Sequence, residues 1–205
     1  MTFLQAIILG ILQGLTEFLP ISSSGHLVIL PFFLNWQLPE KEMFLFNVLV
    51  QVGTMVAVII YFWKDLIAII TDFFKQLFSG TPFATTNARL GWLLIIATIP
   101  AGLAGLFLQD LVEASFTSPL FAGIALMITA LLMILGEKIN QKIGGIQDIT
   151  LLEAIFMGVM QCLALFPGIS RSGATISGGM MRSLRREAAG KFSFLMAVPI
   201  MLAAG

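Results

Sequence analysis

Charged residues are scarce in this sequence, and their scarcity decides the class of protein. Only 11% of the 205 residues are Asp, Glu, Lys or Arg, whereas 58% are hydrophobic; a soluble domain would carry about 25% charged residues. So few charges cannot cover a surface that faces water, and most of this chain must therefore face lipid. The formal net charge of zero and the lack of a basic arm argue against a nucleic-acid partner.

Cysteine is nearly absent as well. Cys162 stands alone, which excludes an internal disulfide and any cysteine-based metal cage. The first residues, Met1–Gln5, carry no positive charge and no small-residue cleavage site. They are therefore expected to be the start of the mature protein rather than a signal peptide.

Long apolar runs are what the sequence does contain. A bilayer-crossing helix needs roughly 20 apolar residues, and three stretches qualify: Met43–Trp63, Leu90–Leu108 and Pro119–Gly136. A fourth begins at Phe192 and is still apolar at Gly205. The sequence thus predicts an all-α integral membrane protein, a multi-span helical bundle forming a single membrane domain over residues 1–205.

Two further apolar regions, 3–36 and 149–181, are each interrupted by a polar turn that contains glycine. The turns are Pro20–His26 and Pro167–Gly173. Irregular backbone at membrane depth is tolerated only where it is buried in protein or lines a water-filled cavity. Each region therefore predicts a re-entrant hairpin of two short helices joined by a turn.

The basic residues favour this topology. If both hairpins re-enter, the linkers 64–89, 137–148 and 182–191 are all cytoplasmic and hold nine of the eleven Lys and Arg residues. Lys41 then lies outside, and Arg171 lies in the second turn. Because cytoplasmic loops are enriched in Lys and Arg, the N-terminus is expected outside.

The two interrupted regions are copies of each other. Residues 6–27 align without a gap to residues 154–175 and are identical at ten of 22 positions. The shared polar pattern has Gln13, Ser22, Ser24 and Gly25 in the first copy and Gln161, Ser170, Ser172 and Gly173 in the second. Since the copies enter from opposite sides, we expect an inverted-topology repeat, with repeat one at about 1–108 and repeat two at about 119–205. In such repeats the broken helices meet near the midplane and build the binding site.

The copies differ at three positions that matter for chemistry. Glu17, Ser23 and His26 in the first copy correspond to Leu165, Arg171 and Ala174 in the second. The first copy thus supplies an acid and a base, and the second supplies a cation.

Each of these side chains has a functional and a structural interpretation. Imidazole is the usual general base near neutral pH, so His26 is a candidate base, with a hydrogen-bonded structural histidine as the alternative. A carboxylate at membrane depth is costly and indicates function, although Glu17 could also pair with Arg171. The planar guanidinium of Arg171 suits phosphate oxygens and predicts a diphosphate clamp.

Hydroxyls and glycines surround these groups. Turns that lead into helix N-termini are anion sites, so the expected substrate-binding residues are Gln13, Ser22, Ser24, Gly25, Ser170, Ser172, Gly173 and Thr175. A polar stripe on the first span, formed by Asn47, Gln51 and Thr54, either lines the cavity or makes hydrogen bonds between helices.

At these residues the chain resembles the bacterial undecaprenyl-diphosphatase family, the membrane phosphatases linked to bacitracin resistance. The first family motif appears as Gln13–Glu17 followed by Phe18–His26, and the second as Pro167–Thr175. Supporting matches are Phe46–Val48 with Gln51 and Gly53, Pro100–Ala101, Arg186–Ala188 and Phe192–Phe194.

The resemblance implies hydrolysis of undecaprenyl diphosphate to the monophosphate, which recycles the lipid carrier for cell-wall synthesis. It implies a bacterial cytoplasmic membrane location, with an active site open to the extracytoplasmic side. It also implies an active centre of Glu17, His26, Arg171 and a serine of the first turn, of which we favour Ser23. A divalent cation, Mg²⁺ or Ca²⁺, is expected at Glu17 and Gln13, although Gln13 replaces a second glutamate found in many members. The family continues with further membrane helices after the run at Phe192, so a truncated form is expected here.

The sequence is also compatible with other functions. A transporter or flippase of an anionic prenyl phosphate would share the inverted repeat, but it needs the Arg171 clamp and no acid–base pair. The histidine-nucleophile lipid phosphatases share the Ser24–His26 element, but their mechanism needs two histidines. The attacking group is either Ser23 or a water, and self-association into a homodimer is also open.

Overall fold

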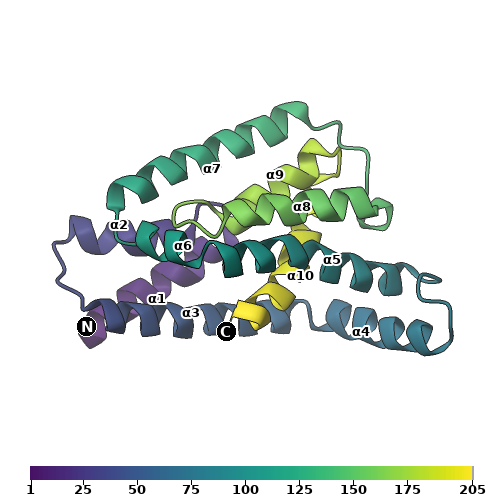
Figure 1. Ribbon diagram of the computed structural model, residues 1–205, viewed down its shortest axis with the longest axis horizontal. Helices are drawn as coiled ribbons and strands as arrows, with labels where there is room; N and C mark the ends of the chain where they lie inside the picture. Colours follow the sequence, from purple (N-terminus) through teal and green to yellow (C-terminus); the bar gives the residue numbers. More distant parts are fainter. Residues whose placement is uncertain (205) are drawn as a thin grey trace.

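The computed structural model describes residues 1–204, which form ten α-helices and one short 3-10 helix (Figure 1). The elements are α1 Phe3–Phe18, α2 Ser23–Phe33, α3 Glu40–Tyr61, α4 Trp63–Phe78, α5 Thr86–Phe107, α6 Gln109–Ser115, α7 Pro119–Ile139, η1 Ile146–Asp148, α8 Leu151–Leu163, α9 Arg171–Met181 and α10 Arg186–Ala204. The one β-bridge within this range joins Gly144 to Leu184. The prediction of an all-helical protein is therefore confirmed, while the predicted end of the last span at Gly205 lies outside the described residues.

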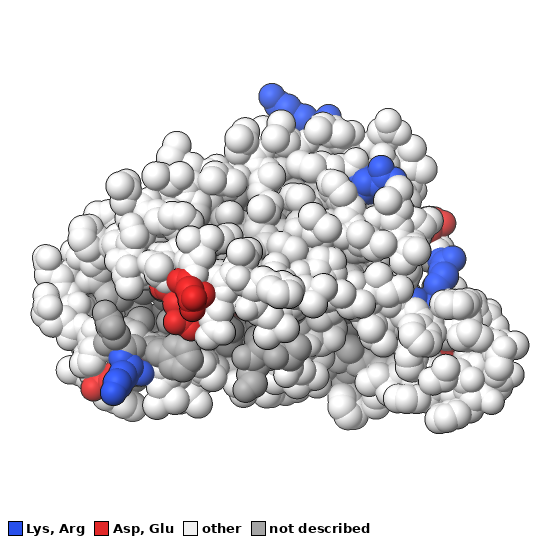
Figure 2. Space-filling model, in the orientation of Figure 1, with Lys and Arg blue, Asp and Glu red and all other residues white. Residues whose placement is uncertain are grey.

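The three uninterrupted spans are present as helices. Within the described residues, three helices are long and apolar enough to cross a bilayer: Lys41–Tyr61 of α3, Thr86–Phe107 of α5 and Pro119–Ile139 of α7. Figure 2 shows broad areas of surface without a charged side chain between a few isolated charged groups. A chain with such helices and such a surface is a membrane protein.

Residues 64–89 were expected to form a linker, and this prediction is wrong over residues 64–78. The chain forms the helix α4 there, which lies end to end with α3 along one edge of the molecule (Figure 1). Its charged residues suggested a loop, but they lie on one side of an amphipathic helix. Ile69 is buried on the other side, and Phe73 packs so closely on Gly91 of α5 that a Cβ there would lie 2.8 Å from its ring.

Both interrupted regions form two helices joined by a turn, and both begin with the same cap. Thr2 caps α1 and exchanges hydrogen bonds with Gln5, and Thr150 caps α8 and exchanges them with Glu153. This capping box satisfies two backbone N–H groups at the helix start. Thr2 and Gln5 align with Thr150 and Glu153, so the correspondence of the copies extends beyond the identical positions. In Figure 1, α2 lies towards the left end and α8 and α9 lie to the right of the turns.

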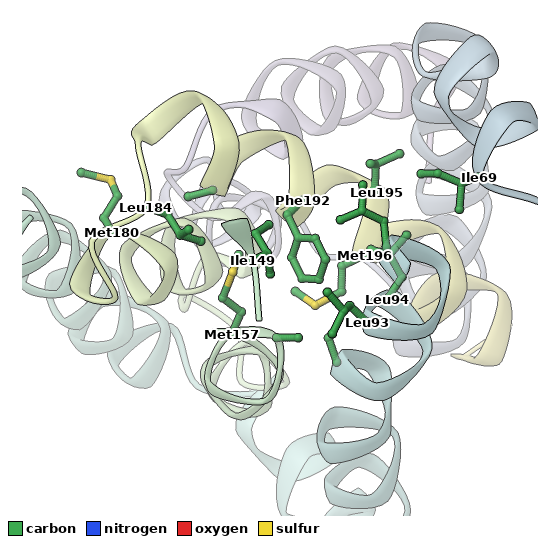
Figure 3. Close-up of a cluster of buried hydrophobic side chains, with 14 residues drawn as sticks. Ile69, Leu93, Leu94, Ile149, Met157, Met180, Leu184, Phe192, Leu195 and Met196 are labelled. Carbon is green, nitrogen blue, oxygen red and sulfur yellow. The ribbon is translucent and has the colours of Figure 1, made fainter. Parts of the chain in front are cut away.

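Close packing, rather than removal of apolar surface from water, must hold the helices together, because lipid is as apolar as the side chains. The largest group of buried side chains lies between α5, α8, α9 and α10, with Phe192 of α10 at its centre (Figure 3). Small residues bring α5 against α8. A Cβ at Gly158 would lie 2.4 Å from the carbonyl oxygen of Ala97, a distance that real Cβ atoms do not reach.

This close approach predicts opposite effects for two aligned glycines. We expect Gly158→Ala to destabilise the protein by at least about 1–3 kcal/mol, because the added methyl must push α5 away from α8. Gly10, the counterpart of Gly158 in α1, has nothing within 4 Å of an added Cβ. Gly10→Ala should therefore be neutral or stabilising by up to about 1 kcal/mol through helix propensity. Thermal unfolding in detergent checks both variants, and equal losses would contradict the packing described here.

Candidate functional site

The two polar turns have the same hydrogen bonds. Ser22 precedes α2, and its Oγ accepts a hydrogen bond from the N–H of Gly25 at 3.2 Å. Ser170 precedes α9, and its Oγ accepts one from the N–H of Gly173 at 3.0 Å. In both turns the cap is also within hydrogen-bond distance of the serine two residues on, Ser24 at 3.3 Å and Ser172 at 3.2 Å. The repeated Ser-x-Ser-Gly pattern is thus a pair of serine helix caps.

The turns contact each other reciprocally. A Cβ on Gly25 would lie 2.8 Å from Cα of Gly168, and a Cβ on Gly173 would lie 3.2 Å from the carbonyl oxygen of Pro20. Pro20 aligns with Gly168, as Gly25 aligns with Gly173, so one contact is the image of the other. Reciprocal pairing of this kind is characteristic of a two-fold relation between two similar units. It explains why both glycines are needed: a side chain at either position would separate the turns.

The second turn is also tied to α7. The hydroxyl of Thr129 donates to the carbonyl oxygen of Gly168 at 3.0 Å and accepts from the N–H of Ser170 at 3.0 Å. The first turn carries strain instead. Ser22 has a φ of +66°, which costs a non-glycine residue about 1–3 kcal/mol and is typical of functional sites.

An ion pair joins the two turns at their centre. Arg171 Nη2 donates to Glu17 Oε1 at 2.7 Å, and both side chains are largely buried, at 15% and 10% exposure. The other carboxylate oxygen, Oε2, accepts from the hydroxyl of Ser23 at 2.5 Å and from Nε2 of Gln13 at 3.1 Å. Among the described residues, Arg171 Nη1 is buried without a hydrogen-bond partner. The guanidinium therefore has a free donor for an anion, and its pairing with Glu17 keeps the buried charge compensated.

A cavity of about 260 Å³ opens at this ion pair. Both copies line it at matching positions: Thr16, Glu17, Ser22, Ser23 and Ser24 from the first, and Ala164, Leu165, Ser170, Arg171 and Ser172 from the second. This space is far larger than the roughly 30 Å³ that one water occupies. It can therefore hold a polar group much larger than water beside the free donor of Arg171.

The structure brings together only part of the predicted site. Glu17, Ser23 and Arg171 meet in the cavity, and Ser22, Ser24, Ser170 and Ser172 line it. Within residues 1–204, the lining does not include the other predicted binding residues. Gln13 donates a hydrogen bond to Glu17, and Gly25 and Gly173 lie where the two turns approach each other most closely. Thr175 is fully buried, with its hydroxyl 2.7 Å from the carbonyl oxygen of Arg171 and 2.7 Å from Oγ of Ser193.

His26 lies one turn into α2 and contacts the strained residue. Its Nδ1 is 2.7 Å from the carbonyl oxygen of Ser22. Because a carbonyl only accepts, Nδ1 must carry the proton, and the lone pair of the neutral ring is on Nε2. The cavity lining in the described part of the chain does not include His26. Its hydrogen bond to Ser22 is the structural role weighed above, and a catalytic role stays a prediction.

The residues around Glu17 fit a hard divalent cation in one respect. Oε1 of Gln13 is a buried amide oxygen that has no partner among the described residues, and it lies beside the only carboxylate that lines the described cavity. Mg²⁺ usually binds through one or two carboxylates together with substrate phosphates. No cluster of three or more His, Cys, Asp or Glu side chains that could hold a metal occurs in the part of the chain described. Any cation must therefore take most of its other ligands from substrate and water.

Gln51 of α3 lines the cavity, which is one of the two roles predicted for the polar stripe, whereas the hydroxyl of Thr54 bonds to carbonyl oxygens of its own helix. The apolar lining residues were not predicted from the sequence. The apolar wall is formed by Val112, Phe116, Ile200 and Met201 of α6, its C-terminal cap and α10. These are ordinary apolar residues, and no motif in the sequence distinguishes them from lipid-facing ones.

Comparison with known proteins gives a consistent result over the whole chain. Residues 6–205 match the family model described as bacitracin resistance protein BacA. The chain is 44% identical to an undecaprenyl-diphosphatase of Chlorobium phaeobacteroides (strain BS1), over all of this chain and 74% of the relative. It is 44% identical to undecaprenyl-diphosphatase 1 of Corynebacterium jeikeium (strain K411), with coverage of 100% and 72%, and 41% identical to the undecaprenyl-diphosphatase of Myxococcus xanthus (strain DK1622), with coverage of 100% and 68%.

Proposed function

Because the chain belongs to the family of the bacitracin resistance protein BacA, we propose that it hydrolyses undecaprenyl diphosphate to undecaprenyl phosphate and inorganic phosphate. This reaction recycles the lipid carrier for cell-wall synthesis. The observation that carries the proposal is the cavity at the ion pair, where the carboxylate of Glu17 accepts hydrogen bonds from both Arg171 and the hydroxyl of Ser23, and where Arg171 has a second donor without a partner among the described residues.

The geometry supports a serine nucleophile activated by Glu17. The hydroxyl of Ser23 already donates to Glu17 Oε2 at 2.5 Å, so Glu17 is placed to take the proton as Oγ attacks the terminal phosphorus. The new Oγ–P bond replaces the bond between that phosphorus and the bridging oxygen, and undecaprenyl phosphate leaves. Water then hydrolyses the phosphoserine and releases inorganic phosphate. If water attacks directly instead, Ser23 only orients the substrate.

Arg171 and the serine caps supply charge stabilisation in this proposal. Phosphoryl transfer spreads negative charge over three oxygens, and donors fixed around them lower the barrier. Arg171 and the N-terminal ends of α2 and α9 all line the cavity. Glu17 and Gln13 would hold a Mg²⁺ or Ca²⁺ ion, which would neutralise further phosphate charge when bound.

Phosphate release from undecaprenyl diphosphate by the purified protein tests the function directly. We expect release that depends on enzyme concentration and falls at least about tenfold with a chelator, because a divalent ion normally shares the charge of a transferring phosphoryl group. Adding back Mg²⁺ or Ca²⁺ should restore it. Undecaprenyl monophosphate is the matched control substrate and should release no phosphate. Absence of release from the diphosphate with either ion would refute the proposal.

Transport of an anionic prenyl phosphate is the alternative that these observations do not favour. The relatives described above are all diphosphatases by name. A transporter also has no need of a serine hydroxyl bonded to a carboxylate beside its anion clamp.

We further propose that α1–α2 and α8–α9 are re-entrant hairpins of an inverted-topology repeat in the bacterial cytoplasmic membrane. The reciprocal contacts of Gly25 with Gly168 and Gly173 with Pro20 support this arrangement. With the N-terminus outside, the cavity opens to the extracytoplasmic side.

Cysteine labelling in intact cells tests the orientation. In a Cys162→Ala background, Ser79→Cys and Gln141→Cys should be shielded from an impermeant thiol reagent, because both exposed positions lie in cytoplasmic segments. Ala114→Cys, at the exposed end of α6, should be labelled. The neighbouring Ser115 is unsuitable, because it is 8% exposed and its hydroxyl bonds to Val112. Labelling of Gln141→Cys from outside would contradict re-entry of α8–α9.

A further inference from the structure

Thr129 lies in the middle of α7, outside both interrupted regions and outside the cavity lining described above. It is 3% exposed, and its hydroxyl donates to the carbonyl oxygen of Gly168 and accepts from the N–H of Ser170, both at 3.0 Å. These two backbone groups belong to the peptide planes on either side of Ile169. One side chain from another helix therefore fixes both peptide planes at the centre of the second turn.

Other threonines of the membrane helices use their hydroxyls differently. Thr16 donates to the carbonyl oxygen of Leu12 at 2.7 Å, and Thr98 donates to that of Leu94 at 2.8 Å. This bond to the carbonyl four residues back is the usual one for a threonine inside a helix. The hydroxyl of Thr129 instead bonds to a turn that lies 39 and 41 residues further along the chain.

The turn that Thr129 holds leads directly to Arg171. Ser170 is the N-terminal cap of α9, and Arg171 is the first residue of that helix. The backbone of Ser170 thus sets where the Arg171 side chain begins, and the guanidinium must reach Glu17 at 2.7 Å from there. A misplacement of about 1 Å in a catalytic group can lower a rate about a hundredfold.

The methyl group of Thr129 has a separate neighbour. A Cβ on Gly173 would lie 3.0 Å from Cγ2 of Thr129, so the methyl lies against the first turn of α9. The two halves of the side chain can therefore be removed one at a time. Thr129→Val keeps the branched shape and loses the hydroxyl, whereas Thr129→Ser keeps the hydroxyl and loses the methyl.

We infer that Thr129 is a positioning residue for Arg171. Its hydroxyl fixes the second turn so that the guanidinium reaches both Glu17 and the cavity. The inference rests on the proposed function, because it assigns the guanidinium to the diphosphate of the substrate. Thr129 acts through Arg171 and does not itself contact substrate.

Two measurements test the inference: the kcat of phosphate release from undecaprenyl diphosphate, and the Kd of inorganic pyrophosphate with Mg²⁺ by titration calorimetry. Thr129→Val should lower kcat at least about tenfold and weaken pyrophosphate binding at least about threefold, because the donor is misplaced. Thr129→Ser should stay within about twofold of the parent in both. In an Arg171→Ala background, Thr129→Val should change kcat less than about twofold, since no guanidinium is left to position.

Two controls separate positioning from stability. Thr98→Val removes a hydroxyl that bonds within its own helix and should leave kcat and Kd within about twofold. Thr129→Val leaves two buried backbone groups without their partner, so its Tm should fall by about 2–8 °C. Gly158→Ala, which is expected to lose stability at the contact of α5 with α8, should keep its turnover at a temperature where all variants are folded.

The inference is overturned if Thr129→Val matches the parent in kcat and Kd, or if Thr129→Ser loses as much as Thr129→Val. A loss of kcat that persists in the Arg171→Ala background also overturns it, as does a parent that binds no pyrophosphate. If the parent binds pyrophosphate but releases no phosphate, the enzymatic proposal fails and the Kd values still decide the role of Thr129. If Thr129→Val does not fold, Thr129→Cys, whose thiol is a weak hydrogen-bonding group, takes its place and should weaken binding at least about threefold.

Discussion

Arg171→Ala is expected to reduce phosphate release from undecaprenyl diphosphate by at least about a hundredfold, the scale of losing a preorganised charge at a phosphoryl transition state. The guanidinium has two roles in the proposed mechanism: Nη1, which has no partner among the described residues, is the proposed donor to phosphate, and Nη2 pairs with Glu17 at 2.7 Å. Arg171→Lys keeps the positive charge but loses the planar guanidinium, which can donate two parallel hydrogen bonds. This variant should therefore have less than about a tenth of the parent's activity. The measurement is the initial rate of phosphate release at saturating substrate.

A second arginine of the same hairpin provides the control. Arg182, the C-terminal cap of α9, pairs with Glu153 of α8 at 3.0 Å, and neither residue lines the described cavity. Arg182→Ala should lower stability in a similar way, because it also removes the partner of a glutamate, yet it should change turnover little in the protein that remains folded. Equal losses of turnover in the two variants would show that Arg171 acts only through folding.

Glu17→Gln is expected to lower turnover by about 10²–10⁴-fold, the usual contribution of a general base. Ser23→Ala should do the same if serine is the nucleophile, because the two side chains form one hydrogen-bonded unit at 2.5 Å. Residues that act as a unit are strongly non-additive, so the double variant should be little worse than either single one. A phosphoserine that acid quench traps in the parent but not in Ser23→Ala would identify Ser23 as the nucleophile.

Two results would contradict this assignment. Activity of Ser23→Ala within about tenfold of the parent would remove serine from the nucleophile role and leave water. If Glu17→Gln kept its turnover and His26→Ala lost it, the general base would be His26 and not Glu17. His26→Ala also removes the hydrogen bond to the strained Ser22 turn, so its thermal stability must be compared with that of the parent.

Much of the fold could be predicted because membrane helices obey simple rules of length and composition. Three spans and both interrupted regions lie within a few residues of their predicted limits. The helix α4 was missed because its charged residues resemble those of a loop, and only its burial against α5 identifies it as a packed helix. The start of α10 at Arg186, six residues before the apolar run at Phe192, was missed for the same reason.

The sequence by itself determined the class of protein, the internal repeat and the chemical inventory of the turns. The bilayer fixes the length and the apolar composition of each spanning segment, so these segments can be recognised from the sequence. The repeat can be found by aligning the sequence with itself. The tertiary structure decided which of these residues meet. Spacing along the chain cannot tell that Ser23 donates to Glu17 while His26 turns back to Ser22, because both distances depend on how the strained turn closes. The cavity wall contributed by Gln51, Phe116 and Met201 also depends on helices far apart in sequence. In a membrane protein, apolar residues cover the lipid-facing surface as well as the cavity wall, so their type does not show where they lie. Only the packing of the helices distinguishes the residues that face the cavity from those that face the membrane.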